Sequence, residues 1–151
     1  MRRTFLKRST GLKKAPKTRA KPSVLRSLKN KTWELCKAIT RLKYGNVCYT
    51  CDRGDLAKTQ WQTGHFIARS VGGLSLKYKL ENLRPQCYAC NINLSGNGAI
   101  FYRRMVEREG QEYVDALFAE KDKITKETKD FYYDLIAEYK KILTTLTQPT
   151  V

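Results

Sequence analysis

The chain has 151 residues, 41% of them apolar and 29% charged, and its thirty lysines and arginines against fourteen acids give a formal net charge of +16. This length fits one domain with tails, and so large a positive charge indicates a polyanionic partner, above all nucleic acid. The sequence has no apolar run of the roughly 18 residues that a membrane span needs, and no apolar stretch with a cleavage site follows its basic N-terminus. Membrane proteins, secreted proteins, collagen-like chains and repeat arrays are therefore not expected.

The positive charge is concentrated at the N-terminus. Half of the lysines and arginines, but only one acid, fall in residues 1–43. Residues 1–22 contain no acid and too few apolar residues to offset the entropy of ordering, so we expect a disordered basic segment. It is either an arm that lies along phosphates or a solubilising tail, and the single sign of its charge favours the arm.

Residues 23–45 are predicted to form a basic amphipathic helix. Leu28, Leu35 and Ile39 recur at helical spacing, while Ser23 can cap the start and Gly45 can end the helix. We expect Cys36, on the apolar side, to be a small buried hydrophobe. The opposite face, which is either a DNA contact or an ordinary solvated surface, carries Arg26, Lys29, Lys37 and Arg41.

The segment 46–110 is rich in turns and is predicted to form two short strands, at 61–67 and 81–87, joined by a loop with a Gly-Gly turn. A helix follows, which Asn97 can cap and Gly110 can end. The C-terminal region, 111–151, is predicted to contain a short helix at 111–120 and a long one at 125–146. The apolar face of the long helix, assigned to packing, comprises Phe131, Leu135, Tyr139, Ile142 and Leu146.

Four of the five cysteines form two Cys-x2-Cys pairs, Cys48 with Cys51 and Cys87 with Cys90. Two such pairs provide a tetrahedral thiolate site for zinc, and four protein ligands leave no open position, so the predicted zinc is structural. A redox function needs one pair within a thioredoxin-like pattern, which this sequence lacks. Metal-bound thiolates also indicate a reducing compartment, the cytoplasm.

The only histidine, His65, lies in a predicted strand between the two cysteine pairs. Imidazole titrates near neutrality and can take a proton from water. Asn82 and Asn91 follow it, the second directly after the last paired cysteine. An amide oxygen is a hard ligand that suits Mg²⁺ or Mn²⁺.

Together, the first cysteine pair, Gly64-His65-Phe66 and the run NLRPQCYACN from Asn82 to Asn91 resemble the HNH, or ββα-metal, endonucleases. With the following SGN and FYRR, they are more narrowly similar to the NinG (Rap) recombination nucleases of lambdoid phages, which are similar in organisation to phage endonuclease VII. The resemblance covers about residues 30–145. It implies an α+β, mostly α fold, in which a small zinc-bound ββα-metal core at 46–110 is flanked by N-terminal and C-terminal helices.

The resemblance also implies roles for single residues. His65 matches the general base, Asn91 matches a ligand of the catalytic Mg²⁺ or Mn²⁺, and Asn82 matches the asparagine that holds the loop and orients the histidine. Gly64 departs from the pattern, because many HNH enzymes have Asp or His there as a second metal ligand. Six residues are alternative sources of that ligand: Asp52, Asp55, Gln62, Thr63, Asn93 and Ser95.

The predicted function is that of a metal-dependent endonuclease that hydrolyses phosphodiester bonds in branched recombination intermediates, Holliday junctions or flaps, in the cytoplasm of a phage's bacterial host. A symmetric junction would favour a homodimer. The alternative is a non-catalytic zinc-ribbon protein that binds nucleic acid, which Gly64 favours. The candidate phosphate contacts, each of which is otherwise solvated surface, are Arg69, Lys77, Lys79 and Arg84.

Overall fold

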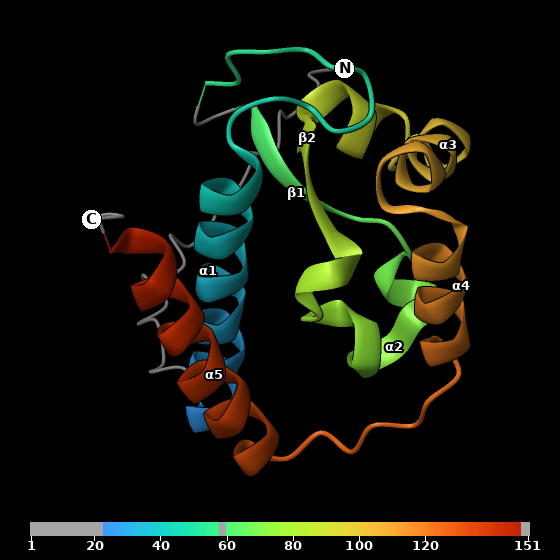
Figure 1. The fold of residues 1–151 in the computed structure, drawn as a ribbon. Helices are drawn as coiled ribbons and strands as arrows, with labels where there is room; N and C mark the ends of the chain where they lie inside the picture. Colours follow the sequence, from blue (N-terminus) through green and yellow to red (C-terminus); the bar gives the residue numbers. More distant parts are fainter. Residues whose placement is uncertain (1–22, 58–59, 149–151) are drawn as a thin grey trace, which may run out of the picture.

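A two-stranded ribbon lies between two pairs of helices in the computed structural model, which describes residues 23–57 and 60–148 (Figure 1). The predicted basic arm, residues 1–22, lies outside the described residues. The fold is α+β and mostly helical, as predicted. Its longer elements are α1 (Val24–Tyr44), β1 (Trp61–His65), α2 (Arg69–Lys77), β2 (Leu83–Cys87), α3 (Gly98–Glu109), α4 (Gln111–Glu120) and α5 (Lys129–Thr147). None of the helices in these described ranges is long and apolar enough to cross a membrane.

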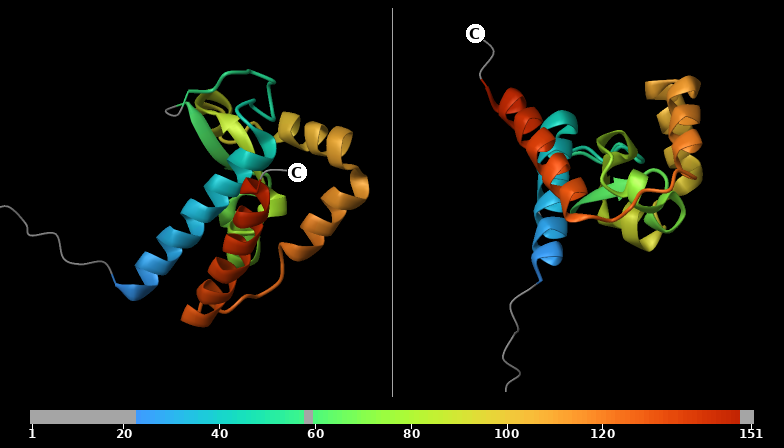
Figure 2. Two further views of the ribbon diagram at one scale, coloured as in Figure 1. Left: turned by 60° about the vertical axis from the view of Figure 1, so that its left-hand side comes forward. Right: turned by 90° about the horizontal axis from the view of Figure 1, so that it is seen from below.

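Helix α1 confirms the helix predicted from residue 23. The Ser23 hydroxyl accepts a hydrogen bond from the backbone N–H of Arg26 at 3.3 Å, and Gly45, with a φ of 71°, ends the helix. Leu28 and Ile39 are buried on one face. Helix α5 lies alongside α1 and runs in the same direction, as all three views show (Figure 1 and Figure 2).

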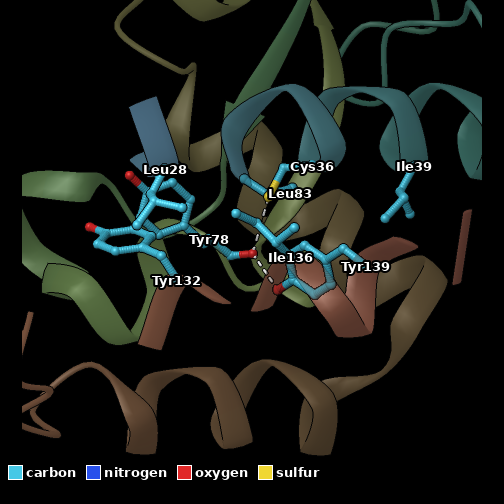
Figure 3. Close-up of a cluster of buried hydrophobic side chains, with 8 residues drawn as sticks. All are labelled: Leu28, Cys36, Ile39, Tyr78, Leu83, Tyr132, Ile136 and Tyr139. Atoms are coloured by element: carbon cyan, nitrogen blue, oxygen red, sulfur yellow. Dashed lines mark hydrogen bonds between the residues drawn. The ribbon is translucent and has the colours of Figure 1, made fainter. Parts of the chain in front are cut away.

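The core between α1, α5 and the start of β2 is organised around the carbonyl of Tyr78 (Figure 3). The Cys36 thiol donates to this oxygen at 3.4 Å and the Tyr139 hydroxyl donates at 2.7 Å. Burial raises the pKa of the Cys36 thiol to about 12, so the thiol stays protonated. The expectation that Cys36 is a buried structural residue is confirmed.

The buried face of α5 differs from the predicted one by a small rotation. Tyr132, Ile136 and Tyr139 are buried, whereas Leu146 is 42% exposed. The helix begins at residue 129 rather than 125, because the Thr128 hydroxyl caps it by accepting from the backbone N–H of the third residue along, at 3.1 Å. The other predicted apolar residues, Phe131, Leu135 and Ile142, pack at the margin of this core.

Both predicted strands are present and pair antiparallel, with Trp61 opposite Cys87 and His65 opposite Leu83. Every residue of β2 is buried. This register places the second cysteine pair at one end of the ribbon and the histidine at the other.

The loop predicted across residues 69–79 is wrong, because most of it is helix α2. Gly72 lies inside this helix, where a Cβ atom would come within 2.8 Å of the Cβ of Leu76. Gly73 has a φ of 57° and kinks the helix. The two glycines therefore permit a tight, kinked helix with Leu76 buried beneath it, rather than a turn between strands.

Beyond the ribbon, a single π-helical turn (Ala89–Asn93) leads into α3. Asn97 precedes α3 as predicted, but its side chain makes no capping bond and donates instead towards the Cys90 sulfur at 3.9 Å. Gly110, with a φ of 94°, ends α3 and starts α4, which confirms both predicted helices.

Candidate functional site

The four paired cysteines meet at one end of the ribbon. Their sulfur atoms all lie within 4.8 Å of one another, and the Cys51 and Cys87 sulfurs are 3.8 Å apart. Four sulfurs that each lie about 2.3 Å from a tetrahedral zinc ion are about 3.8 Å apart, which is the spacing of the Cys51 and Cys87 sulfurs. The cluster could therefore bind a structural metal such as zinc, and its thiolates would then tie two distant segments together.

Local backbone bonds shape both cysteine pairs. The Cys90 N–H donates to the Cys87 sulfur at 3.4 Å, and the Asp52 N–H donates to the Cys48 carbonyl at 2.9 Å. The Asp52 carboxylate then forms ion pairs with Arg104 and Arg108 on α3. This carboxylate anchors the first pair to α3, which leaves it poorly placed to serve as a ligand beside His65.

A cavity of about 370 Å³ brings together His65, from the end of β1, and Asn91, from the turn after the last cysteine. Of the six other side chains expected as candidate metal ligands, Gln62, Thr63 and Ser95 line this cavity. Asp55 and Asn93 are exposed and are not part of the wall as described. Besides His65, the polar side chains of the cavity wall are thus two amides, two hydroxyls and the guanidinium of Arg69.

The imidazole of His65 is fixed on one edge and covered on one face. Its Nε2 lies 2.9 Å from the Lys77 carbonyl oxygen, and its ring stacks on Trp33 with centroids 5.3 Å apart. A carbonyl only accepts, so Nε2 carries the proton and Nδ1 has the lone pair. Burial lowers the pKa of His65 to about 4, and the charges of Arg69 and Lys77 also lower it, against the opposing effect of the hydrogen bond. The ring is therefore neutral at pH 7 and able to accept a proton at Nδ1.

Asn82 holds both ends of α2 and, through them, the histidine. Its Oδ1 accepts from the Ile67 N–H at 2.7 Å, while its Nδ2 donates to the carbonyls of Ile67 and Leu76 at 3.0 and 3.1 Å. Ile67 lies two residues after His65, and Leu76 precedes the Lys77 carbonyl that accepts from the ring. Fully buried, Asn82 has no surface for DNA and acts as a positioning residue.

Arg84 was expected to contact phosphate, and the structure contradicts this. Its side chain is fully buried and donates to Glu109 Oε1 at 2.8 and 3.2 Å. Its guanidinium carbon also lies 4.5 Å from the ring centroid of Tyr44. Arg84 lies in a buried strand, and Glu109 balances its charge inside the protein. The sequence pattern does not indicate this pairing.

The other predicted phosphate contacts lie at the surface. Arg69 is exposed at the rim of the His65 cavity. Lys77 is half-buried beside a second hollow that Arg69 also lines, whereas Lys79 forms an ion pair with Glu120 at 2.6 Å. Trp33 was not expected in the site, because a tryptophan on the apolar side of an amphipathic helix is indistinguishable in sequence from a core residue.

Comparison with known proteins places the chain in a family. The family model described as "Bacteriophage Lambda NinG protein" matches residues 3–148. The chain is 33% identical over 70 residues to protein ninG of Escherichia phage lambda, and 31% identical over 70 residues to protein ninG of Salmonella phage P22; each match covers 46% of this chain and 33% of the relative. The chain thus spans about a third of the length of these curated relatives, and no solved structure matches it. The match to the family model covers nearly the whole chain, and the protein therefore belongs to the NinG family of bacteriophage proteins.

Proposed function

We propose that this protein is a metal-dependent DNA endonuclease of the HNH type, which cuts branched recombination intermediates such as Holliday junctions or flaps. The observation that carries the proposal is the cavity shared by His65 and Asn91. A neutral histidine whose Nε2 donates to a carbonyl has its Nδ1 lone pair available to take a proton from water, and Asn91 lines the same cavity.

The chain's residues divide the chemical work. His65 Nδ1 would take the proton of a water aligned with the scissile phosphorus, and Trp33 and the Lys77 carbonyl hold the ring in place for this. Asn91 would offer an oxygen to Mg²⁺ or Mn²⁺, and Arg69 at the rim would hold a flanking phosphate. A bound divalent cation supplies charge neutralisation at the phosphate and at the leaving oxygen.

The zinc-bound thiolates have a separate role. Asn91 follows Cys90 directly, so the cluster fixes the position of the turn that carries the amide. A homodimer would match the symmetry of a four-way junction, and positive charge would attract its phosphates. The dimer and the DNA-binding surface are both predictions.

The test is single-turnover cleavage of four-way junction, flap and linear duplex DNA by zinc-loaded protein, with Mg²⁺, with Mn²⁺ or without added divalent ions. His65→Ala is compared with the wild type at matched DNA occupancy. General-base assistance is worth about 10² to 10⁴ in rate, so a loss of that size is expected with binding retained.

Equal rates for the two proteins would remove His65 from the mechanism. Binding of junction DNA without cleavage by the wild type, under every divalent ion, would instead support the non-catalytic nucleic-acid-binding alternative. Asn91→Ala serves as a second variant, because its deficit should shrink at high Mn²⁺ whereas the loss of a base should not.

A further inference from the structure

A second hollow, of about 490 Å³, shares Arg69 with the cavity described above. One wall is α2, which contributes Arg69, Ser70 and Lys77. The other wall is the segment between α4 and α5, which contributes Thr125 and Glu127. Two of these side chains are cations and two carry hydroxyls that can donate, so the hollow combines groups that bind an anion with a single acid.

The carboxylate of Glu127 is paired with groups outside the hollow. Lys29, on α1, forms an ion pair with its Oε1 at 2.6 Å, and the Tyr132 hydroxyl, on α5, donates to the same oxygen at 2.5 Å. The hydrogen bond from Lys29 is the largest cause of the lowered pKa of Glu127, so the carboxylate stays ionised within this pair. Glu127 is thus committed to Lys29 rather than to either cation that lines the hollow.

The two cations of the hollow form no ion pair within residues 23–57 and 60–148. Arg69 is exposed, and Lys77 is half-buried with its ammonium 5.0 Å from the ring centroid of Tyr78. Tyr78 belongs to the core, so this contact restricts where the ammonium can move. A concave site lined by unpaired charges of one sign concentrates the electric field and attracts an anion.

Both cations lie close to the imidazole of His65. The Lys77 carbonyl accepts from its Nε2 at 2.9 Å, and Arg69 lines its cavity. After burial, which is the largest cause, the charges of Arg69 and Lys77 also lower the pKa of His65. A DNA strand carries a phosphate about every 3.4 Å along the helix axis, so a strand that enters the cavity brings another phosphate within reach of the hollow.

We infer that the hollow between α2 and the segment 121–128 binds a backbone phosphate of the DNA strand, next to the phosphate that enters the His65 cavity. Its donors are the guanidinium of Arg69, the ammonium of Lys77 and the hydroxyl of Thr125. This inference rests on the proposed function, which places a phosphodiester in the cavity. Contacts with phosphates fix the position of a strand and carry no base information, so the hollow would align the scissile bond without sequence preference.

The test measures binding to zinc-loaded full-length protein without added divalent ions. Lys77→Met removes the ammonium and keeps the carbonyl that holds His65, while Glu127→Gln removes the one acid of the hollow. Lys140→Met is the matched control, at an exposed lysine of α5 that does not line the hollow. Fluorescence anisotropy gives the affinity for labelled four-way junction DNA across a range of salt. NMR of the His65 imidazole follows inorganic phosphate at pH 7 and constant ionic strength.

Lys77→Met should weaken junction binding about 8-fold at 0.1 M salt and make the salt slope less negative by about 0.9, the contribution of one phosphate contact. Lys140→Met should behave as the wild type. Inorganic phosphate should shift the imidazole resonance saturably in the wild type and in Lys140→Met, but not in Lys77→Met over the same concentrations. Glu127→Gln should tighten the binding of both probes, because it removes a negative charge and releases Lys29.

Equal effects of Lys77→Met and Lys140→Met on DNA binding would overturn the inference, as would weaker DNA binding by Glu127→Gln. Lys77-dependent binding of inorganic phosphate with unchanged DNA affinity would also overturn it, because the hollow would then be a site for small anions only. Failure of the proposed function gives a different result. Lys77-dependent DNA binding by a protein that cuts no DNA would retain the site and remove the nuclease, whereas cleavage with Lys77-independent DNA binding would do the reverse.

Discussion

Trp33 should control the protonation of His65. The two rings stack with an interplanar angle of 8°, so one face of the imidazole is closed to water. Burial is the largest cause of the low pKa of His65. In Trp33→Ala that face becomes hydrated, which stabilises the imidazolium, and the pKa should rise from about 4 towards the ordinary value of 6.5. Trp33→Phe keeps an aromatic plane there and should leave the pKa close to that of the wild type.

The same pKa predicts how stability depends on pH. The folded-state pKa of His65, about 4, lies below its unfolded value of 6.5, so between these pH values the unfolded chain binds the additional proton. The contribution of His65 is fully present above pH 6.5 and is lost as the pH falls towards 4. One pKa unit corresponds to about 1.4 kcal/mol, so the free energy of unfolding should fall by up to about 3 kcal/mol across this window. Trp33→Ala should show a smaller fall.

The measurement is direct, because the chain has one histidine. In an untagged protein, its imidazole proton shift is followed by NMR from pH 8 to the lowest pH at which zinc is retained, and unfolding by urea is measured at the same pH values. A wild-type pKa near 6.5 would refute the burial argument. A pKa that is low in the wild type and equally low in Trp33→Ala would show that the stacked ring is not what excludes water.

Three further predictions concern the rest of the molecule. Elemental analysis should find one zinc ion per chain, and Cys87→Ser should lose it together with the circular dichroism of the folded protein; wild type purified without chelator and lacking zinc would contradict this. Arg84→Met should lower the free energy of unfolding in urea by about 3 kcal/mol, because it leaves Glu109 without its buried partner. It should not change the salt dependence of DNA binding. A flatter salt dependence in this variant would show that Arg84 does contact phosphate. Deletion of residues 1–22 should make the slope of log affinity against log salt less negative by about 5, if roughly six of the segment's cations each contribute about −0.9. An unchanged slope would mean that the segment is a solubilising tail.

Much of the fold follows from local sequence signals. Capping residues and apolar spacing predict α1, α3 and α4, and the two strands follow from short apolar stretches bounded by turns. One wrong prediction concerns α2, whose Gly-Gly pair was interpreted as a turn in a loop. Glycine disfavours helix by about 1 kcal/mol, but tertiary contacts override this: Leu76 is buried, and Asn82, which lies outside the helix, holds its ends.

The charged residues show a similar limit. Arg84, Lys79 and Arg69 are alike in sequence as cations near a nucleic-acid motif, yet one is buried, one is paired and one is exposed at the cavity. What separates them is the position of acids far along the chain, Glu109 and Glu120, which spacing does not reveal. A positive net charge therefore predicts the class of partner without predicting which side chains reach it.

The geometry of the candidate site depends on two separate anchors, which the sequence alone does not place relative to one another. Asn91 is placed by the four-cysteine cluster, because it follows Cys90, while His65 is placed by Asn82 through α2. Each anchor has its own motif in the sequence. The space between them depends on the ribbon register and on Gln86, which fills the position above Gly64. The missing side chain at position 64 is thus explained by an amide on the partner strand, a relation between residues 22 positions apart that only the folded chain reveals.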